Sequence, residues 1–220
     1  MRSMLVTVAL ALMAAAMLPA NGFDTEPAGN RFEGRALLEW LDDDPFIPKM
    51  RLMEDLAFHQ QDGNIWVVPA GSIVDGRSMP ALFNKLMGHP FESGFRKAAL
   101  SYDFAAKSRQ HSWRDAQRMF HDATIAEGVL PIEAKVMYLL LYAKGLRWAV
   151  RNTRDCHGRC HSRDQALEWS PVVKDQQVIA LVGWVRSEDP SLDEIEHSVD
   201  VVTLQKGPHV IGRIADVPKK

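Results

Sequence analysis

Five polar residues have the types and spacing to do chemistry together. Asp75 and Ser78 lie in a stretch rich in turn-forming residues, and Tyr102 and Asp103 lie side by side in a stretch with a helical pattern. Asp115 belongs to the next helical stretch. Carboxylates that converge on one pocket can bind a divalent metal ion or divide the roles of general acid and general base, and a phenol can donate a hydrogen bond. We treat these five residues as the candidate catalytic set.

The same residues also have structural explanations. Asp75 stands before a glycine, a pair typical of turns. Asp115 stands near the start of a predicted helix, where a carboxylate satisfies free backbone N–H groups. Asp103 could form a buried ion pair with an arginine, either Arg77 or Arg96. The sequence leaves the catalytic and the structural explanations open.

A second cluster combines sulfur and imidazole ligands over six residues of the chain. Cys156, His157, Cys160 and His161 are donors that zinc prefers, although their spacing is not that of a standard zinc finger. They also form a variant of the haem-attachment sequence. In an oxidising compartment, a local disulfide between Cys156 and Cys160 is the simplest outcome, with free thiols as the remaining alternative. The spacing favours the disulfide over zinc.

The overall composition is that of a folded globular protein. The 220 residues are 46% hydrophobic and 25% charged, with a formal net charge of -2. These values argue against a disordered, collagen-like or polytopic membrane chain. A nearly neutral chain has no general attraction for nucleic acid, and the basic stretch 147–163 has too few aromatic residues to favour nucleic-acid binding. Two cysteines cannot form a disulfide scaffold.

The first 22 residues have the pattern of a secretory signal peptide. A basic start at Arg2 is followed by an apolar run from Met4 to Leu18, and small residues precede Phe23. The run is shorter than the roughly 20 residues of a spanning helix, so we expect cleavage before Phe23 and no integral membrane span afterwards. The expected location is the periplasm or the exterior of the cell.

The segment that follows changes from strand patterns to helix patterns. Short strands are expected within residues 31–70, with a hairpin whose turn contains Asp62-Gly63 and whose return strand is 65–68. From residue 80 the apolar spacing becomes helical, over 95–106, from Ser112 onward and from Pro131 onward. The apolar run 136–143 predicts that the third of these helices is the most buried. The expected fold class is α+β, with an N-terminal antiparallel sheet followed by a three-helix segment.

The C-terminal part is harder to predict. The block 178–185 is apolar and short enough to be a strand or a buried helical turn, and Ser191 with Glu194 predicts a capped helix. We expect three parts: the signal peptide 1–22, an α+β domain 23–150, and a C-terminal extension 151–220 that carries the Cys-His cluster.

Three motifs give the chain a resemblance to a known family. The stretch Val68 to Pro80 resembles the "VPxGFxTDxxSxP" signature of a bacterial and phage family, known as domain of unknown function 1353. Residues 98–103 resemble the family's "AAxxHD" helix, and residues 114–129 resemble its "ADxxFxxAxxxxGV" helix. The resemblance covers roughly residues 31–149. Tyr102 stands where the family has histidine, and Ser72-Ile73-Val74 replaces its Phe-x-Thr.

These observations predict an exported bacterial protein that is a binding or assembly module of the cell envelope or of phage origin. The alternative is a cell-envelope hydrolase acting on peptidoglycan or a peptide, with Asp75 and Asp103 central and a divalent metal, zinc included, as an optional cofactor. The loss of the family histidine at Tyr102 favours the binding module. A peptidoglycan fragment or an envelope protein is the expected partner.

Overall fold

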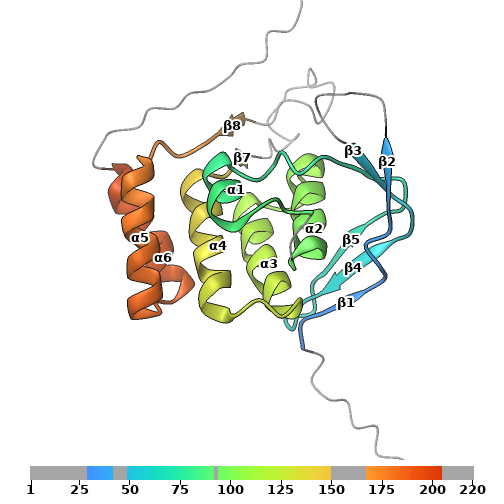
Figure 1. Cartoon of the computed structure of the whole chain (residues 1–220), viewed down its shortest axis with the longest axis horizontal. Coiled ribbons are helices and arrows are strands. Elements are labelled where there is room, and N and C mark those ends of the chain that lie inside the picture. The colour runs from blue at the N-terminus through green and yellow to red at the C-terminus, as the bar shows by residue number, and fades with distance from the viewer. Residues whose placement is uncertain (1–28, 42–48, 92–93, 150–166, 205–220) are drawn as a thin grey trace, which may run out of the picture.

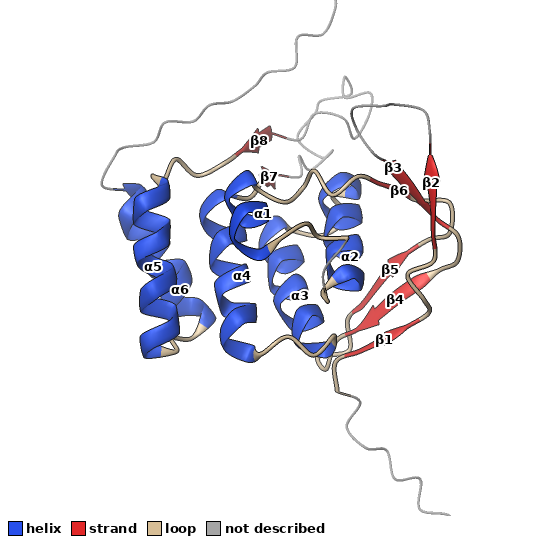
Figure 2. Ribbon diagram, in the orientation of Figure 1, coloured by secondary structure: helices blue, strands red, loops and turns tan. Residues whose placement is uncertain are grey.

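The strands and helices follow one another in the order expected of an α+β fold. The computed structural model describes residues 29–41, 49–91, 94–149 and 167–204. Figure 2 shows the strands that precede the first helix at one side of the molecule and the helices at the other. The strands before the first helix are β1 (Arg31–Glu33), β2 (Leu38–Leu41), β3 (Lys49–Leu52), β4 (Leu56–His59), β5 (Ile65–Val68) and β6 (Ile73–Val74).

The helices occupy most of the remaining described chain, interrupted by one further pair of strands. In chain order the elements are α1 (Ala81–Met87), α2 (Arg96–Ser108), α3 (Trp113–Ala126), α4 (Pro131–Lys144), β7 (Arg147–Ala149), β8 (Leu167–Trp169), α5 (Asp175–Glu188) and α6 (Leu192–Leu204). The three helices predicted within 95–144 are confirmed. The block 178–185 lies in α5, so it is helix rather than strand.

The N-terminal strands form two small antiparallel sheets rather than one. The first has the order β1-β4-β5 and the second β2-β3-β6, while β7 and β8 pair separately. The predicted hairpin joins β4 to β5, with Phe58 opposite Trp66. Its turn is closed by the hydrogen bond from the Gln60 amide to the Asn64 carbonyl at 2.9 Å. Leu56, Phe58, Trp66 and other alternate residues are buried, because one face of each sheet packs on the helices.

Three antiparallel helices, α2, α3 and α4, form the centre of the molecule. The strands contact α2 and α3 on one side, while α5 and α6 contact α4 on the other, as Figure 1 shows. Every residue of α4 from Val136 to Ala143 is buried, which confirms the prediction for this helix. Pro131 is its first residue, where a missing N–H costs nothing.

A glutamate at the end of α3 fixes the start of α2. The backbone N–H groups of Lys97 and Ala98 donate to the two carboxylate oxygens of Glu127, at 3.0 and 2.8 Å. The first N–H groups of a helix lack partners within the helix, so this carboxylate serves as a cap supplied from elsewhere in the chain. The contact joins two helices that are consecutive in the sequence but opposite in direction.

The two C-terminal helices share the hydrophobic core of the rest. Val178, Val182 and Val185 of α5 and Ile195 and Val199 of α6 are buried in the same cluster as the side chains of α4. The predicted Ser191–Glu194 cap is confirmed, since the Ser191 amide donates to the Glu194 carboxylate at 2.7 Å. The division of the chain at residue 150 stays a prediction, but helices from both sides of it pack together.

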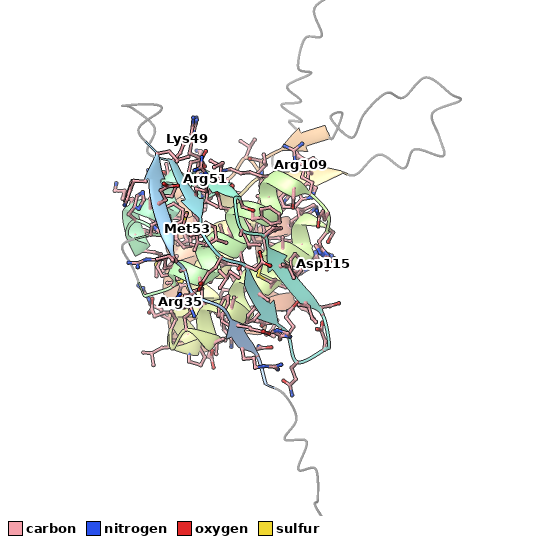
Figure 3. All side chains as sticks on the ribbon, turned by 90° about the vertical axis from the view of Figure 1, so that its right-hand side faces the viewer. Arg35, Lys49, Arg51, Met53, Arg109 and Asp115 are labelled. Carbon is pink, nitrogen blue, oxygen red and sulfur yellow. The ribbon has the colours of Figure 1, made fainter. Side chains whose placement is uncertain are left out.

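Exposed ion pairs cover the strand side of the molecule. Figure 3 shows Arg35 and Arg51 on this face together with Met53. Arg35 binds Glu54 through two nitrogens, and Arg51 lies 2.9 Å from Glu39 on the neighbouring strand. Such surface pairs contribute little to stability individually. None of the helices described has both the length and the apolar character that a membrane crossing requires.

Candidate functional site

An open pocket of about 530 Å³ lies where several elements end. It is lined by the segment before α1, the last turn of α2, the end of α4 and the residue after β8. These parts of the chain lie toward one end of the helical layer in Figure 1. The polar side chains that line it belong to Asp75, Arg77, Ser78, Lys107, Lys144 and Ser170. Two of the five predicted catalytic residues, Asp75 and Ser78, therefore line this pocket.

Asp103 lies directly behind the pocket wall and holds it in place. Its side chain is fully buried in α2. The Asp75 backbone N–H donates to Oδ2 at 3.1 Å, and the Ser78 backbone N–H donates to Oδ1 at 3.3 Å. The structure thus brings Asp75, Ser78 and Asp103 together. Both Asp103 oxygens are used to fix the main chain of the loop, so the carboxylate acts as a clamp.

A lysine, not an arginine, neutralises the two carboxylates. Lys107 Nζ lies 2.8 Å from Asp103 and 2.8 Å from Asp75. The expected pairing of Asp103 with Arg77 or Arg96 is wrong, because the Lys107 side chain lies one helical turn away on the same face of α2. The Arg96 guanidinium instead donates to the Phe91 carbonyl at 2.7 Å.

Asp75 remains ionised at neutral pH. Burial raises the pKa of its carboxyl group, but hydrogen bonds from Lys107 and from the Arg77 backbone outweigh burial and hold the pKa below its usual value. The side chain is 16% exposed, which is enough to face the pocket. A permanently charged carboxylate can accept a hydrogen bond from a ligand, but it cannot serve as a general acid.

The loop that carries these residues has a sterically constrained path. Gly76 has a φ of +66°, a conformation that L side chains rarely adopt. A Cβ atom at this position would lie 2.9 Å from the ring of Phe91 and 3.1 Å from Pro90. The glycine therefore allows the loop to pack on Phe91 while its two ends are held by Asp103.

Tyr102 is in the core and does not line the pocket. Its side chain is fully buried, and its ring packs against that of Phe120 with the centroids 5.6 Å apart. Among the described residues, its hydroxyl has no hydrogen-bond partner. Burial raises the pKa of the phenol far above its usual value. As placed, Tyr102 packs the core behind the Asp103 clamp and does not face a ligand in this pocket.

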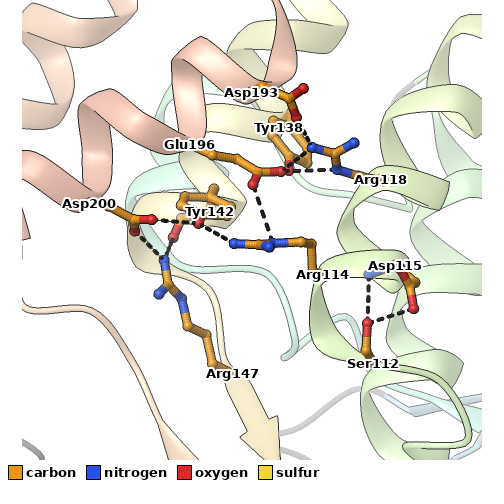
Figure 4. Close-up of polar contacts among 10 residues, drawn as sticks. All are labelled: Ser112, Arg114, Asp115, Arg118, Tyr138, Tyr142, Arg147, Asp193, Glu196 and Asp200. Carbon is orange, nitrogen blue, oxygen red and sulfur yellow. Dashed lines mark hydrogen bonds and ion pairs between the residues drawn. The ribbon is translucent and has the colours of Figure 1, made fainter.

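Asp115 lies in a different place, at the start of α3. Figure 4 shows its side chain beside Ser112. The Asp115 backbone N–H donates to Ser112 Oγ at 3.1 Å, and the Ser112 hydroxyl donates to the Asp115 carboxylate at 2.6 Å. The predicted helix cap is confirmed. Asp115 is not among the residues that line the pocket.

A second polar cluster, which we call the Glu196 cluster, joins α6 to α3 and α4. Glu196 is only 7% exposed and receives hydrogen bonds from Arg118 and from the Tyr138 hydroxyl, with Arg114 at 3.2 Å. Figure 4 shows these side chains converging on one carboxylate. Burial and the Glu196 charge together raise the pKa of Tyr138 well above its usual range. The cluster fixes α6 against α3 and α4.

The described residues offer no ready site for a metal ion. No group of three or more His, Cys, Asp or Glu side chains lies close enough together in the described part of the chain to hold one. At the pocket, the Lys107 ammonium already supplies a cation between Asp75 and Asp103. Cys156, His157, Cys160 and His161 lie outside the described residues, so the disulfide and the zinc site stay predictions.

Sequence reasoning missed two cations at the pocket, Lys107 and Lys144, and considered Arg77 only as an ion-pair partner of Asp103. Lys107 could have been found, since it follows Asp103 by four residues on a predicted helix. Lys144 could not, because only the packing of α4 against the loop brings it to the pocket. Lys144 Nζ lies 2.6 Å from Asp175 at the start of α5, and it also donates to the Val173 carbonyl.

The predicted family resemblance is confirmed over the middle of the chain. A family model described as "Protein of unknown function (DUF1353)" matches residues 50–141. Among curated proteins, the chain is similar to "Uncharacterized protein y4jT" and "Uncharacterized protein y4iH", both of Sinorhizobium fredii (strain NBRC 101917 / NGR234). No solved structure matches the chain.

Both relatives extend beyond the region they share with this protein. The first is 32% identical over 128 residues, which are 58% of this chain and 35% of the relative. The second is 28% identical over 146 residues, which are 66% of this chain and 60% of the relative. The shared region spans only part of each relative's length, and neither name states an activity.

Proposed function

We propose from its pocket that the protein, whose residues 50–141 match the DUF1353 family of proteins of unknown function, is an exported binding module of the bacterial cell envelope. The pocket bounded by the loop 75–80 is its ligand site. Export follows from the signal-peptide pattern of residues 1–22. The phage association that the family resemblance implies stays a prediction.

One observation carries the binding function: the two oxygens of Asp103 are occupied by the loop. Asp103 is fully buried, and its contacts are to the Asp75 amide, the Ser78 amide and Lys107. A general base or nucleophile has to reach the substrate, and this carboxylate reaches only its own protein. The clamp instead preorganises the loop, which favours binding because little freedom is lost when a ligand enters.

The lining suits a polar ligand with charged groups of both signs. It combines the Asp75 carboxylate with three cationic side chains and the hydroxyl groups of Ser78 and Ser170. The peptide stems of peptidoglycan carry carboxylate, amine and amide groups within a few bonds of one another. We therefore propose a peptidoglycan stem peptide as the ligand class.

The alternative is a hydrolase, and Asp75 with Ser78 is the pair on which it would depend. Both residues line the pocket, and the ionised Asp75 has the charge state of a general base. The hydrolase needs a second catalytic group as well, since Asp103 is committed to the loop. A direct assay for peptide cleavage tests this alternative.

The test combines calorimetry with a variant that fills the pocket. Purified stem peptides are titrated into the wild type, into Ser170→Trp and into the control Ser187→Trp, whose serine is exposed at the end of α5. Binding that is lost only in Ser170→Trp supports the proposal. Peptide cleavage products in the same samples, followed by chromatography, would establish the hydrolase instead. Absence of both binding and cleavage would contradict the proposal.

Export is tested independently of ligand binding. The full chain is expressed in bacteria, the compartments are separated, and the N-terminus of the protein is sequenced. A periplasmic protein that begins at Phe23 is the expected result. A protein that retains its first residues in the cytoplasm would contradict export without affecting the binding experiment.

A further inference from the structure

The pocket has two walls that come from different parts of the chain. The first wall consists of the loop 75–80 and Lys107, within the region that matches the family. The second consists of Lys144, Gly145, Leu146 and Ser170, all beyond residue 141 where the family match ends. The first wall therefore lies within the family match, while the second lies beyond its end.

The cationic side chains of the two walls differ in whether they form ion pairs. Lys107 is neutralised by Asp75 and Asp103. Lys144 is paired with Asp175 and also holds the Val173 carbonyl, so it fastens the second wall to α4. Arg77 is exposed at the pocket, and its charge helps to lower the pKa of Asp75, but within the described part of the chain no carboxylate forms an ion pair with its guanidinium. One cation at the pocket is thus left for a ligand.

The backbone of Arg77 is held firmly even though its side chain is not. Its N–H donates to Asp75 Oδ1 at 3.1 Å, and the next amide, that of Ser78, is held by Asp103. Gly76 on its other side packs on Phe91. A guanidinium on a fixed backbone can donate two parallel hydrogen bonds to the two oxygens of a carboxylate in one planar contact.

We infer that Arg77 binds a carboxylate of the ligand and that the second wall, fastened by Lys144, selects what that carboxylate is attached to. The inference rests on the proposed function and deepens it. The anchoring group is a terminal carboxylate of a peptide, which occurs at the end of a stem peptide. A ligand that has lost this charge, for example by amidation, binds weakly.

The experiment compares an acid with its amide in one pocket. The probes are the tripeptide L-alanyl-γ-D-glutamyl-meso-diaminopimelate and the same tripeptide with its terminal carboxylate amidated. Each is titrated into the full mature chain, into Arg77→Gln and into Arg31→Gln. Arg31 is an exposed arginine of β1, in the sheet that does not carry the pocket loop, and it provides the matched control.

We expect binding affinity to fall in only one variant and for only one of the two probes. Arg77→Gln weakens binding of the acid about tenfold or more and leaves the amide unchanged, because a hydrogen-bonded ion pair contributes roughly that much to affinity. Arg31→Gln binds both probes as the wild type does. Circular dichroism of the variants shows that the fold is retained.

Three other outcomes are distinguishable from one another. Equal affinity of the wild type for acid and amide would overturn the carboxylate inference while leaving the binding function in place. Equal loss in Arg77→Gln and Arg31→Gln would also overturn it, since only net charge would then matter. If the wild type binds neither probe, the proposed function itself fails and the inference fails with it.

Discussion

Lys107 lies one helical turn after Asp103 on α2, and its ammonium group is 2.8 Å from the Asp103 carboxylate. The same carboxylate receives two backbone N–H groups of the pocket loop. One buried side chain thus connects a helix, its own counter-ion and the loop that bounds the pocket.

Asp103→Asn is expected to lower the free energy of unfolding by about 2–4 kcal/mol, because a buried carboxylate with a charged partner is lost. Asp75→Asn should cost about 1 kcal/mol or less, since its side chain is partly exposed. Urea denaturation measures both. An unchanged or raised stability in Asp103→Asn would mean that the residue is kept for activity and not for the fold.

Acid should weaken the protein partly through Asp75. Its folded pKa is lowered, so its stabilising contribution is complete above its unfolded pKa of about 4 and is lost as the pH falls through the folded value. Denaturation curves at pH 7 and near pH 3 are compared for the wild type and Asp75→Asn. The variant should lose less stability between the two pH values. An identical loss in both proteins would show that Asp75 does not titrate with folding.

Glu196→Gln should destabilise the protein by about 2–3 kcal/mol, because Arg114 and Arg118 would lose their shared buried counter-charge. Asp193→Asn is the matched control. Asp193 contacts Arg118 as well, but its side chain is 82% exposed, so we expect a change below about 1 kcal/mol. Similar values for the two variants would mean that burial does not govern the Glu196 cluster.

Glu127→Ala should remove the cap of α2 and cost about 1 kcal/mol, seen as a lower thermal midpoint. Glu188→Ala, at the last residue of α5, removes a carboxylate at another helix end and should have little effect. Hydrogen exchange gives a local readout: the amides of Lys97 and Ala98 should exchange faster in Glu127→Ala. Unchanged exchange there would contradict the capping role.

The two cysteines should be joined when the protein is purified from an oxidising compartment. We expect no alkylation of Cys156 and Cys160 without reductant, and no stoichiometric metal by elemental mass spectrometry. Two free thiols with one bound zinc ion would instead place a metal at the Cys-His cluster. Bound metal with oxidised thiols would point back to the carboxylates of the pocket and to the hydrolase.

The local elements could be predicted because each has a local signal. The Asp62-Gly63 turn, the Ser112 cap and Pro131 mark boundaries that the structure reproduces within a residue or two. The pairing of the strands could not be predicted in the same way. Residues 50–53 and 56–59 are neighbours in the sequence, yet β3 and β4 belong to different sheets.

The candidate site could be predicted only in part from the sequence, for a related reason. Asp75, Ser78 and Asp103 could be grouped from the motifs that contain them, and they do meet. Tyr102 is adjacent to Asp103 in the sequence, but successive residues of a helix point in different directions, so it faces the core. The second wall of the pocket depends on the path of the chain after α4, and no short sequence motif predicts that path.

The complete burial of α4 has a practical consequence for how this domain can be handled. The family match ends at residue 141, inside α4, whereas α5 and α6 cover the side of that helix that the rest of the domain leaves open. A shortened protein cut at the family boundary would present part of an apolar helix to water and would be prone to aggregate. Expression boundaries and domain transplants are therefore best placed after α6, because this helix contributes to the shared hydrophobic core.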